Sequence, residues 1–186
     1  DLVPIYQTTS FVFKDTDDAA NLFSLQKYGN VYSRLSNPTV AALEERIASL
    51  EGGIGAVATA SGMAAEFITF AALCQAGDHI VASSQLYGGT VTQLDVSLRR
   101  FGIETTFVEG TDPADYKAAL TENTKAIYTE VVANPSGEIA DLEGLAAVAH
   151  EAGVPLVVDA TISTPYLIRP LEHGADIVIH SATKFL

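Results

Sequence analysis

Short apolar runs alternate along the chain with longer segments of helical periodicity. Five runs are rich in β-branched residues and have the length of buried strands; they cover residues 80–83, 103–108, 126–130, 156–159 and 176–180. Between the first four runs, apolar residues recur every three to four positions, which predicts helices over 90–101, 113–120 and 141–152. Strands that alternate with helices form a mostly parallel sheet with helices on both faces. The pattern therefore predicts an α/β fold.

Two further helices are expected ahead of the first of these strands. Asn37 can cap a helix that starts with proline and carries an apolar stripe up to Gly52. Ser61 can cap a second helix, which stops before Gly77. Residues 54–59 lie between the two and are expected to form a short strand.

Residues 1–36 lack this regularity. One short helix is predicted over residues 15–25, and the turn-rich segment after it carries Tyr32 and Arg34. Such a segment has few ways to bury itself, so we expect it to cross to a second subunit. The predicted organisation is an N-terminal arm over residues 1–36 and an α/β domain over residues 37–186.

Composition narrows the class of protein. The 186 residues carry a net charge of −13 with ten scattered basic residues, which argues against nucleic acid and anionic membrane as partners. No apolar run reaches transmembrane length, and no signal-peptide pattern opens the chain. The single cysteine, Cys74, excludes an internal disulfide and fits a reducing cytoplasm. Because the chain starts at Asp1 and ends soon after the last strand, we expect it to be cut at both ends.

The last predicted strand runs into Ser181, Thr183 and Lys184. In an open parallel sheet, ligands bind at the carboxyl ends of the strands. A lysine that is desolvated beside an apolar strand becomes a neutral amine nucleophile, and neighbouring hydroxyls can donate to an anion. This combination suits a Schiff base with pyridoxal phosphate whose phosphate the hydroxyls hold. A surface lysine that closes a strand would give the same pattern.

Asp159 ends another apolar strand. A carboxylate there is costly to bury unless it meets a cation or a donor. A protonated pyridine nitrogen is such a partner, and the alternative is a local cap on Thr161.

Three other strand-to-helix loops carry weaker signals. Ser61-Gly62-Met63 opens a helix and presents N–H groups to an anion. Tyr87 precedes two glycines and can stack on a flat heteroaromatic ring, and Asn134 can donate to a phenolate-like oxygen. Each loop also fits an ordinary turn. The four histidines show no metal-ligand spacing, so no metal site is expected.

Taken in order, these residues resemble the Cys/Met-metabolism branch of fold-type I pyridoxal-phosphate enzymes. The motifs that carry the resemblance run through the whole chain: Pro4-Ile5-Tyr6-Gln7-Thr8-Thr9, Tyr32-Ser33-Arg34, Asn37-Pro38-Thr39, Leu43-Glu44, Leu50-Glu51-Gly52, Ser61-Gly62-Met63, Tyr87-Gly88-Gly89-Thr90, Asn134-Pro135, Val158-Asp159 and His180-Ser181-Ala182-Thr183-Lys184. Any one of them is weak, but their common order over one chain is specific.

The resemblance implies a role for each matching residue. Lys184 would hold pyridoxal 5'-phosphate as a Schiff base and move protons between substrate carbons, while Tyr87 would stack on the ring and deprotonate the incoming amine. The other contacts would be Asp159 at the pyridine nitrogen, Asn134 near the phenolic oxygen, Gly62, Met63, Ser181 and Thr183 at the phosphate, and Tyr32 and Arg34 at the phosphate of a neighbouring subunit. A cytoplasmic homo-oligomer, a dimer of dimers, is also implied.

Two features set this chain apart from the complete family pattern. The family usually has asparagine where this chain has Ala160, so we expect a polar group beside the cofactor to be missing. In the family, the arginine that binds the substrate carboxylate lies in a C-terminal domain beyond this chain. The chain alone is therefore expected to bind cofactor better than it turns over substrate.

Within the branch, residues 22–30 and 172–176 are most similar to O-acetylhomoserine sulfhydrylase. The implied reaction is γ-replacement on O-acetylhomoserine by sulfide or a thiol, which gives homocysteine or methionine in methionine biosynthesis. Three alternatives stay open on the sequence: cystathionine γ-synthase, a γ-lyase that degrades cystathionine or methionine, and a catalytically silent truncated paralogue.

Overall fold

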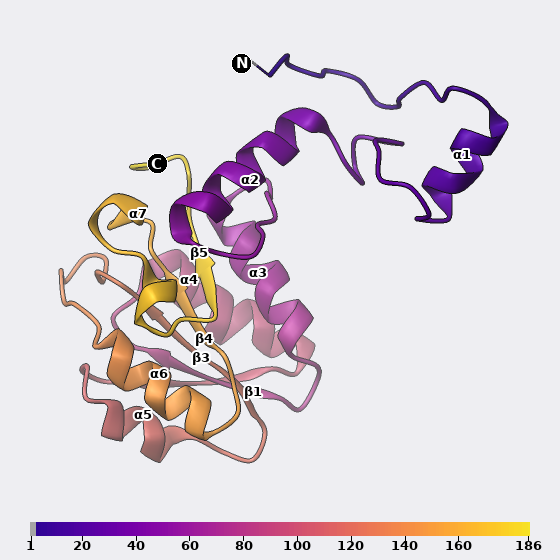
Figure 1. The fold of residues 1–186 in the computed structure, drawn as a ribbon. Helices are drawn as coiled ribbons and strands as arrows, with labels where there is room; N and C mark the ends of the chain where they lie inside the picture. Colours follow the sequence, from indigo (N-terminus) through magenta and orange to yellow (C-terminus); the bar gives the residue numbers. More distant parts are fainter. Residues whose placement is uncertain (1–2) are drawn as a thin grey trace. The chain divides into compact units, whose positions relative to one another are not determined.

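The structure is a computed structural model that describes residues 3–186 (Figure 1). The chain divides into two compact units, Asp1–Ala58 and Thr59–Leu186. The first unit contains α1 (Thr16–Phe23) and α2 (Pro38–Glu51). Both helices start where the sequence predicts, because the side chains of Asp15 and Asn37 accept hydrogen bonds from N–H groups of the first turn.

The strand expected over residues 54–59 is wrong. Residues 54–59 belong to none of the five paired strands that the structure describes among residues 3–186. The side chains of Ile54 and Val57 are exposed. An apolar run is thus not sufficient to predict a strand.

The second unit alternates helices and strands as the sequence predicts. In chain order its elements are α3 (Gly62–Leu73), β1 (His79–Ser83), α4 (Gly88–Thr92), η1 (Gln93–Ser97), η2 (Leu98–Phe101), β2 (Glu104–Val108), α5 (Pro113–Ala119), β3 (Thr124–Glu130), α6 (Leu142–Glu151), β4 (Leu156–Asp159), α7 (Thr164–Leu167), η3 (Pro170–His173) and β5 (Ile177–Ile179). The strands form one sheet in the order β2-β1-β3-β4-β5, and every pairing is parallel. The predicted α/β fold is confirmed.

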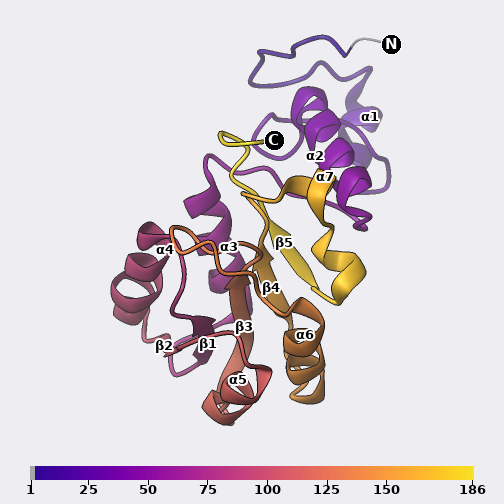
Figure 2. The ribbon, with the colours of Figure 1, turned by 90° about the vertical axis from the view of Figure 1, so that its left-hand side faces the viewer.

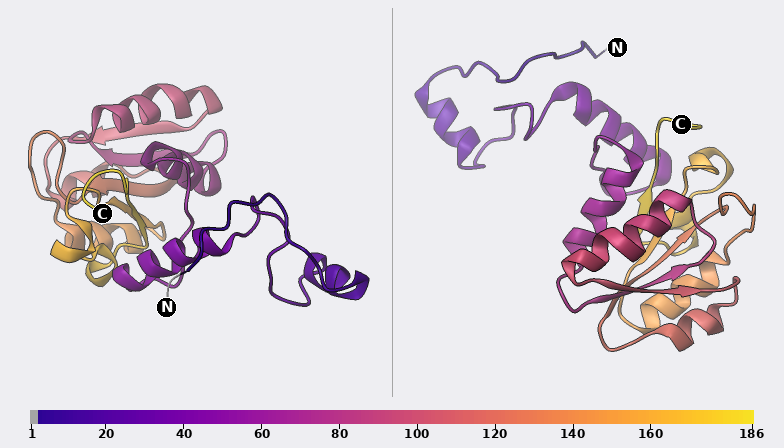
Figure 3. Two further views of the ribbon diagram at one scale, coloured as in Figure 1. Left: turned by 90° about the horizontal axis from the view of Figure 1, so that it is seen from above. Right: turned by 180° about the vertical axis from the view of Figure 1, so that it is seen from behind.

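The sheet buries side chains on both faces, because successive residues of a strand point to opposite faces. In β1, Val81 belongs to one apolar cluster, whereas Ile80 and Ala82 belong to the cluster on the other face. Figure 2 shows the two layers of helices: α5 and α6 lie on the first face, and α3 and α4 lie on the second. The helix predicted over residues 90–101 is the continuous segment α4-η1-η2, which lies along β2 in Figure 3.

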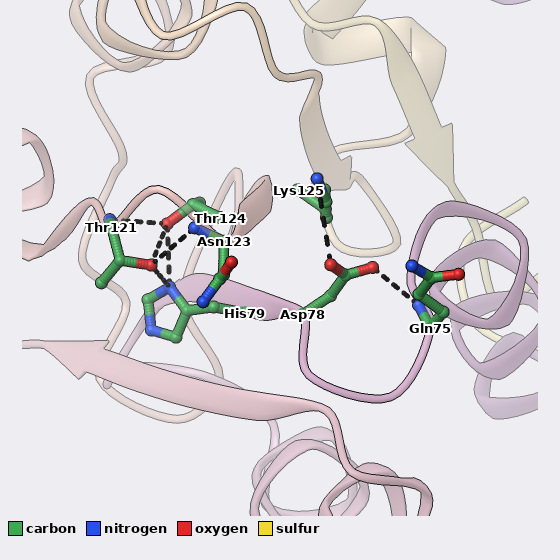
Figure 4. Close-up of polar contacts among 7 residues, drawn as sticks. All are labelled: Gln75, Asp78, His79, Thr121, Asn123, Thr124 and Lys125. Atoms are coloured by element: carbon green, nitrogen blue, oxygen red, sulfur yellow. Dashed lines mark hydrogen bonds and ion pairs between the residues drawn. The ribbon is translucent and has the colours of Figure 1, made fainter.

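The amino end of the sheet carries a polar cluster around His79, which is 8% exposed (Figure 4). Its Nδ1 lies 2.9 Å from the hydroxyl oxygen of Thr124, and its Nε2 lies 2.8 Å from that of Thr106 on β2. Burial lowers the pKa of His79. The neighbouring Asp78 accepts from the N–H of Gln75. Both ring nitrogens of His79 therefore have a hydrogen-bonding partner, which compensates the burial of this side chain.

The short segments α7 and η3, between β4 and β5, were not expected from periodicity. Each has four residues, which is too short for an amphipathic pattern to register. Across residues 3–186, no helix combines the length and the apolar character needed to span a bilayer.

Candidate active site

A cavity of about 250 Å³ opens at the carboxyl ends of β1, β3, β4 and β5. It is far larger than the roughly 10–15 Å³ that a single water needs. The chain reverses its direction of strand addition between β1 and β3, and such a switch point is where open parallel sheets bind ligands. Of the ten residues that the sequence singles out, eight line this cavity: Gly62, Met63, Tyr87, Asn134, Asp159, Ser181, Thr183 and Lys184.

The start of α3 meets the segment after β5 very closely. A β-carbon placed on Gly62 would lie 2.8 Å from the Cβ of Ser181, so a glycine is needed for this approach. The side chain of Ser61 accepts from the N–H of Ala64, while the N–H groups of Gly62 and Met63 belong to the open first turn of the helix. The hydroxyl oxygens of Ser181 and Thr183 lie 3.2 Å apart beside this turn. N–H groups, a helix dipole and two hydroxyls thus converge on one place, which is a cradle for an anion.

Asp159 lies at the end of β4, facing the cavity. Its Oδ1 accepts from the N–H of Thr161 over 2.7 Å, and the Thr161 hydroxyl in turn accepts from the N–H of Ser181 over 2.8 Å. The local cap that the sequence left as an alternative is therefore present. Burial raises the pKa of Asp159, and the bonds to Thr161 oppose that rise. A cationic donor from a ligand would compensate the remaining cost of burial.

Tyr87 precedes α4 and is 51% exposed. Its ring lies against Gly89, where a β-carbon would meet the ring at 2.5 Å. Asn134 follows β3 on the neighbouring loop. Of the two glycines after Tyr87, Gly89 thus leaves room for its ring beside the cavity, whereas a β-carbon at Gly88 would have nothing within 4 Å.

Lys184 lines the cavity with an exposed side chain whose Nζ donates to the hydroxyl of Thr183 over 3.1 Å. The sequence predicts that Lys184 is desolvated beside an apolar strand. This prediction is wrong, because the side chain of Lys184 is exposed in the structure. The buried strand ends at Ile179, so the lysine lies beyond its apolar surroundings.

Ala160 does not line the cavity. Its side chain is completely buried in the apolar cluster that includes Leu145 and Val131, on the α5 and α6 face of the sheet. The expectation that this alanine removes a polar group beside the ligand is therefore wrong. Successive strand residues point to opposite faces, so Asp159 faces the ligand and its neighbour does not.

Tyr32 and Arg34 lie in the first unit. The guanidinium carbon of Arg34 is 5.0 Å from the centre of the Tyr32 ring, a cation–π distance. Tyr32 also forms a bridge with Ser10. Their assignment to the site of a neighbouring subunit stays a prediction.

The sequence reasoning missed two buried glutamates that line the cavity. Glu66, on α3, accepts from the hydroxyls of Thr90 and Tyr128. Burial raises its pKa to about 7. Glu130 ends β3 opposite Asp159 in register, and burial raises its pKa as well. A signal was present for Glu130, since it ends an apolar strand just as Asp159 does.

Comparison with known proteins identifies the class of protein to which this fold and cavity belong. The model of the family described as Cys/Met metabolism PLP-dependent enzyme matches residues 1–186. The chain belongs to this family, and the resemblance seen in its motifs is confirmed.

Individual relatives point in the same direction. The chain is 53% identical over 184 residues to O-acetyl-L-homoserine sulfhydrylase of Leptospira meyeri, covering 99% of this chain and 42% of the relative. It is 58% identical over 185 residues to sulfhydrylase FUB7 of Fusarium oxysporum f. sp. lycopersici, covering 99% and 43%. The chain thus spans less than half the length of these relatives.

A solved structure has the same fold. The crystal structure of a protein described as putative O-acetylhomoserine (thiol)-lyase from Campylobacter jejuni, which contains N'-pyridoxyl-lysine-5'-monophosphate, superposes with a TM-score of 0.94 at 42% identity. The match covers 98% of this chain and 45% of that one.

Proposed function

We propose that the protein containing this chain is a pyridoxal-phosphate-dependent transferase that replaces the γ-substituent of O-acetylhomoserine with sulfide or a thiol. The products would be homocysteine or methionine. The observation that carries the proposal is the convergence of Gly62, Asp159, Lys184 and five further predicted residues on one cavity. The sulfhydrylases and the thiol-lyase to which the chain is similar support this choice of reaction.

The residues of the cavity fit pyridoxal phosphate. The close approach of Gly62 to Ser181 brings the first turn of α3 beside the hydroxyls of Ser181 and Thr183, and this cradle suits the phosphate. Asp159 suits a protonated ring nitrogen because its half-buried carboxylate would gain a cationic donor. When bound, the cofactor supplies an electron sink for carbanion chemistry.

Each residue of the chain then has a proposed task. Lys184 Nζ would hold the cofactor covalently and move a proton between substrate carbons. Tyr87 would stack on the ring and take a proton from the incoming amine, and Asn134 would donate to the phenolic oxygen. Gly62, Met63, Ser181 and Thr183 would hold the phosphate. Tyr32 and Arg34 would reach the phosphate of a neighbouring subunit, in a cytoplasmic homotetramer whose N-terminal arm spans residues 1–36.

The test is chemical labelling of the holoenzyme. Borohydride reduction followed by peptide mapping should place the pyridoxyl group on Lys184. Lys184→Arg keeps the charge but should abolish the label and lower the rate by about three orders of magnitude. Lys117→Arg is the matched control, because Lys117 lies on α5 and its Nζ forms an ion pair with Glu151. A label on another lysine would overturn the assignment.

Product analysis then separates the reactions. Homocysteine formed from O-acetylhomoserine and sulfide would support γ-replacement. Breakdown of methionine or cystathionine alone would identify a γ-lyase instead. A protein that loads cofactor but changes its absorbance with none of these substrates would be a silent paralogue.

A further inference from the structure

One buried carboxylate joins two separate loops of the cavity. Glu130 is 7% exposed and stands at the carboxyl end of β3. Its Oε1 accepts from the backbone N–H of Tyr87 over 2.6 Å, and its Oε2 accepts from the backbone N–H of Asn134 over 2.9 Å. Both oxygens are thus engaged with N–H donors of residues whose side chains line the cavity.

The first of these bonds fixes the turn that leads into α4. The bond from the Tyr87 N–H to Glu130 attaches the start of this turn to the end of β3. At its other end, the hydroxyl of Thr90 donates to both carboxylate oxygens of Glu66, over 2.9 and 3.1 Å. The turn is therefore anchored on two sides, and the Tyr87 ring over Gly89 has a defined place.

Burying the Glu130 carboxylate costs free energy. An apolar residue at position 130 would be cheaper to bury than a carboxylate that stands in register with Asp159 on β4. An apolar residue could not accept from two N–H groups at once. A neutral amide has only one acceptor oxygen, so it could satisfy only one of the two loops.

We propose that Glu130 is a positioning residue, which sets the Tyr87 ring and the Asn134 amide in place for a flat heteroaromatic ligand. The inference rests on the proposed function, in which that ligand is pyridoxal phosphate. Glu130 does not itself contact the ligand in this scheme. It acts by fixing the backbone of two residues that do, so that no ordering of these loops is needed when the ligand binds.

The experiment compares Glu130→Gln with the wild-type protein by titrating the apo form of the full-length protein with pyridoxal phosphate. In the variant, the amide nitrogen faces one of the two N–H groups, which leaves a buried donor unpaired. The Kd for the cofactor should rise about tenfold or more. The visible circular dichroism per bound cofactor should also fall, because the ring loses its fixed orientation. Glu122→Gln, an exposed glutamate just before the same strand, is the matched control and should leave both quantities unchanged.

A double-mutant cycle tests whether Glu130 acts through Tyr87. In a Tyr87→Ala background, Glu130→Gln should cost a smaller factor in Kd than it does in the wild type. Additive losses would overturn the proposal. A variant with a lower melting temperature but an unchanged Kd and dichroism would also overturn it, since that result indicates stability alone.

If Glu130→Gln does not fold, Glu130→Asp, which is one carbon too short to reach both loops, is measured in the same way; failure of both to fold assigns the residue to stability and overturns the proposal. If the wild-type protein itself binds no pyridoxal phosphate, the proposed function fails first, and the two failures are thereby distinguished.

Discussion

At Gly62, the space that a side chain would need is occupied by Ser181. The glycine is not required for its backbone angles, since it begins an ordinary helix capped by Ser61. It is required because two segments far apart in the sequence come together there. A change of one methyl group at this position therefore acts on the anion cradle directly.

Gly62→Ala should weaken the binding of pyridoxal phosphate about tenfold, because the new methyl group pushes the Ser181 segment away from the helix end. The Kd from an absorbance titration of the apo protein measures this effect. Gly55→Ala is the control, since a β-carbon at Gly55 has nothing within 4 Å. Equal Kd values for Gly62→Ala and Gly55→Ala would contradict the assignment of the cradle.

Single residues also mark the limit of sequence reasoning. Asp159 could be recognised because it ends a strand with an unusual side chain, and Lys184 because it follows a strand closely. Glu66 could not, since a glutamate inside a helix looks like a solvated residue until tertiary packing brings Thr90 and Tyr128 to it. The alternation of side chains along a strand places Ala160 on the face opposite Asp159. The resemblance to the family instead suggested that its side chain would lie beside the ligand, where the family has an asparagine.

At the scale of elements, N-cap residues and C-terminal glycines determine many of the helix boundaries. α2 starts after Asn37 and ends at Gly52, whose φ of 76° suits glycine. α6 starts after Asp141, which accepts from the N–H of Gly144. These signals are local, so they can be read from the sequence. The strand expected over residues 54–59 failed because pairing depends on distant segments.

The amino end of the sheet should make stability sensitive to pH. Burial lowers the pKa of His79 below its usual value near 6.5, so the unfolded chain binds this proton more readily than the folded one. The contribution of His79 is therefore complete above about pH 6.5 and is lost as the pH falls through the lower folded pKa. A single proton limits the effect to about 1.4 kcal/mol per pH unit.

Chemical denaturation at pH 7.5 and 5.5 measures this contribution. Glutamine can donate and accept as neutral imidazole does, but it does not titrate in this range. His79→Gln should therefore lose less stability than the wild type over this interval. Parallel losses in the two proteins would show that His79 is not the responsible group.

At the scale of the whole molecule, the two units differ in what they bury. The second unit holds two apolar clusters on the two faces of its sheet. Among residues 3–58, by contrast, Leu22 is the one apolar side chain that is buried. A unit with so little buried apolar surface cannot offset the entropy of ordering its backbone.

Separate fragments should therefore behave differently. Residues 59–186, produced alone, should unfold in one cooperative thermal transition by circular dichroism. Residues 1–58 alone should show no such transition, and their arm would need a partner surface to become ordered. A cooperative transition in the shorter fragment would contradict this view of the arm.

The meeting of Gly62 with Ser181 also has a consequence for biosynthesis. Translation produces α3 and β1 to β4 well before β5 and the segment that carries Lys184. The anion cradle needs both ends of this stretch, so it forms after nearly the whole second unit has left the ribosome. A nascent chain can pair its first strands early, but its anion cradle is complete only after Ser181 and Thr183 have been added.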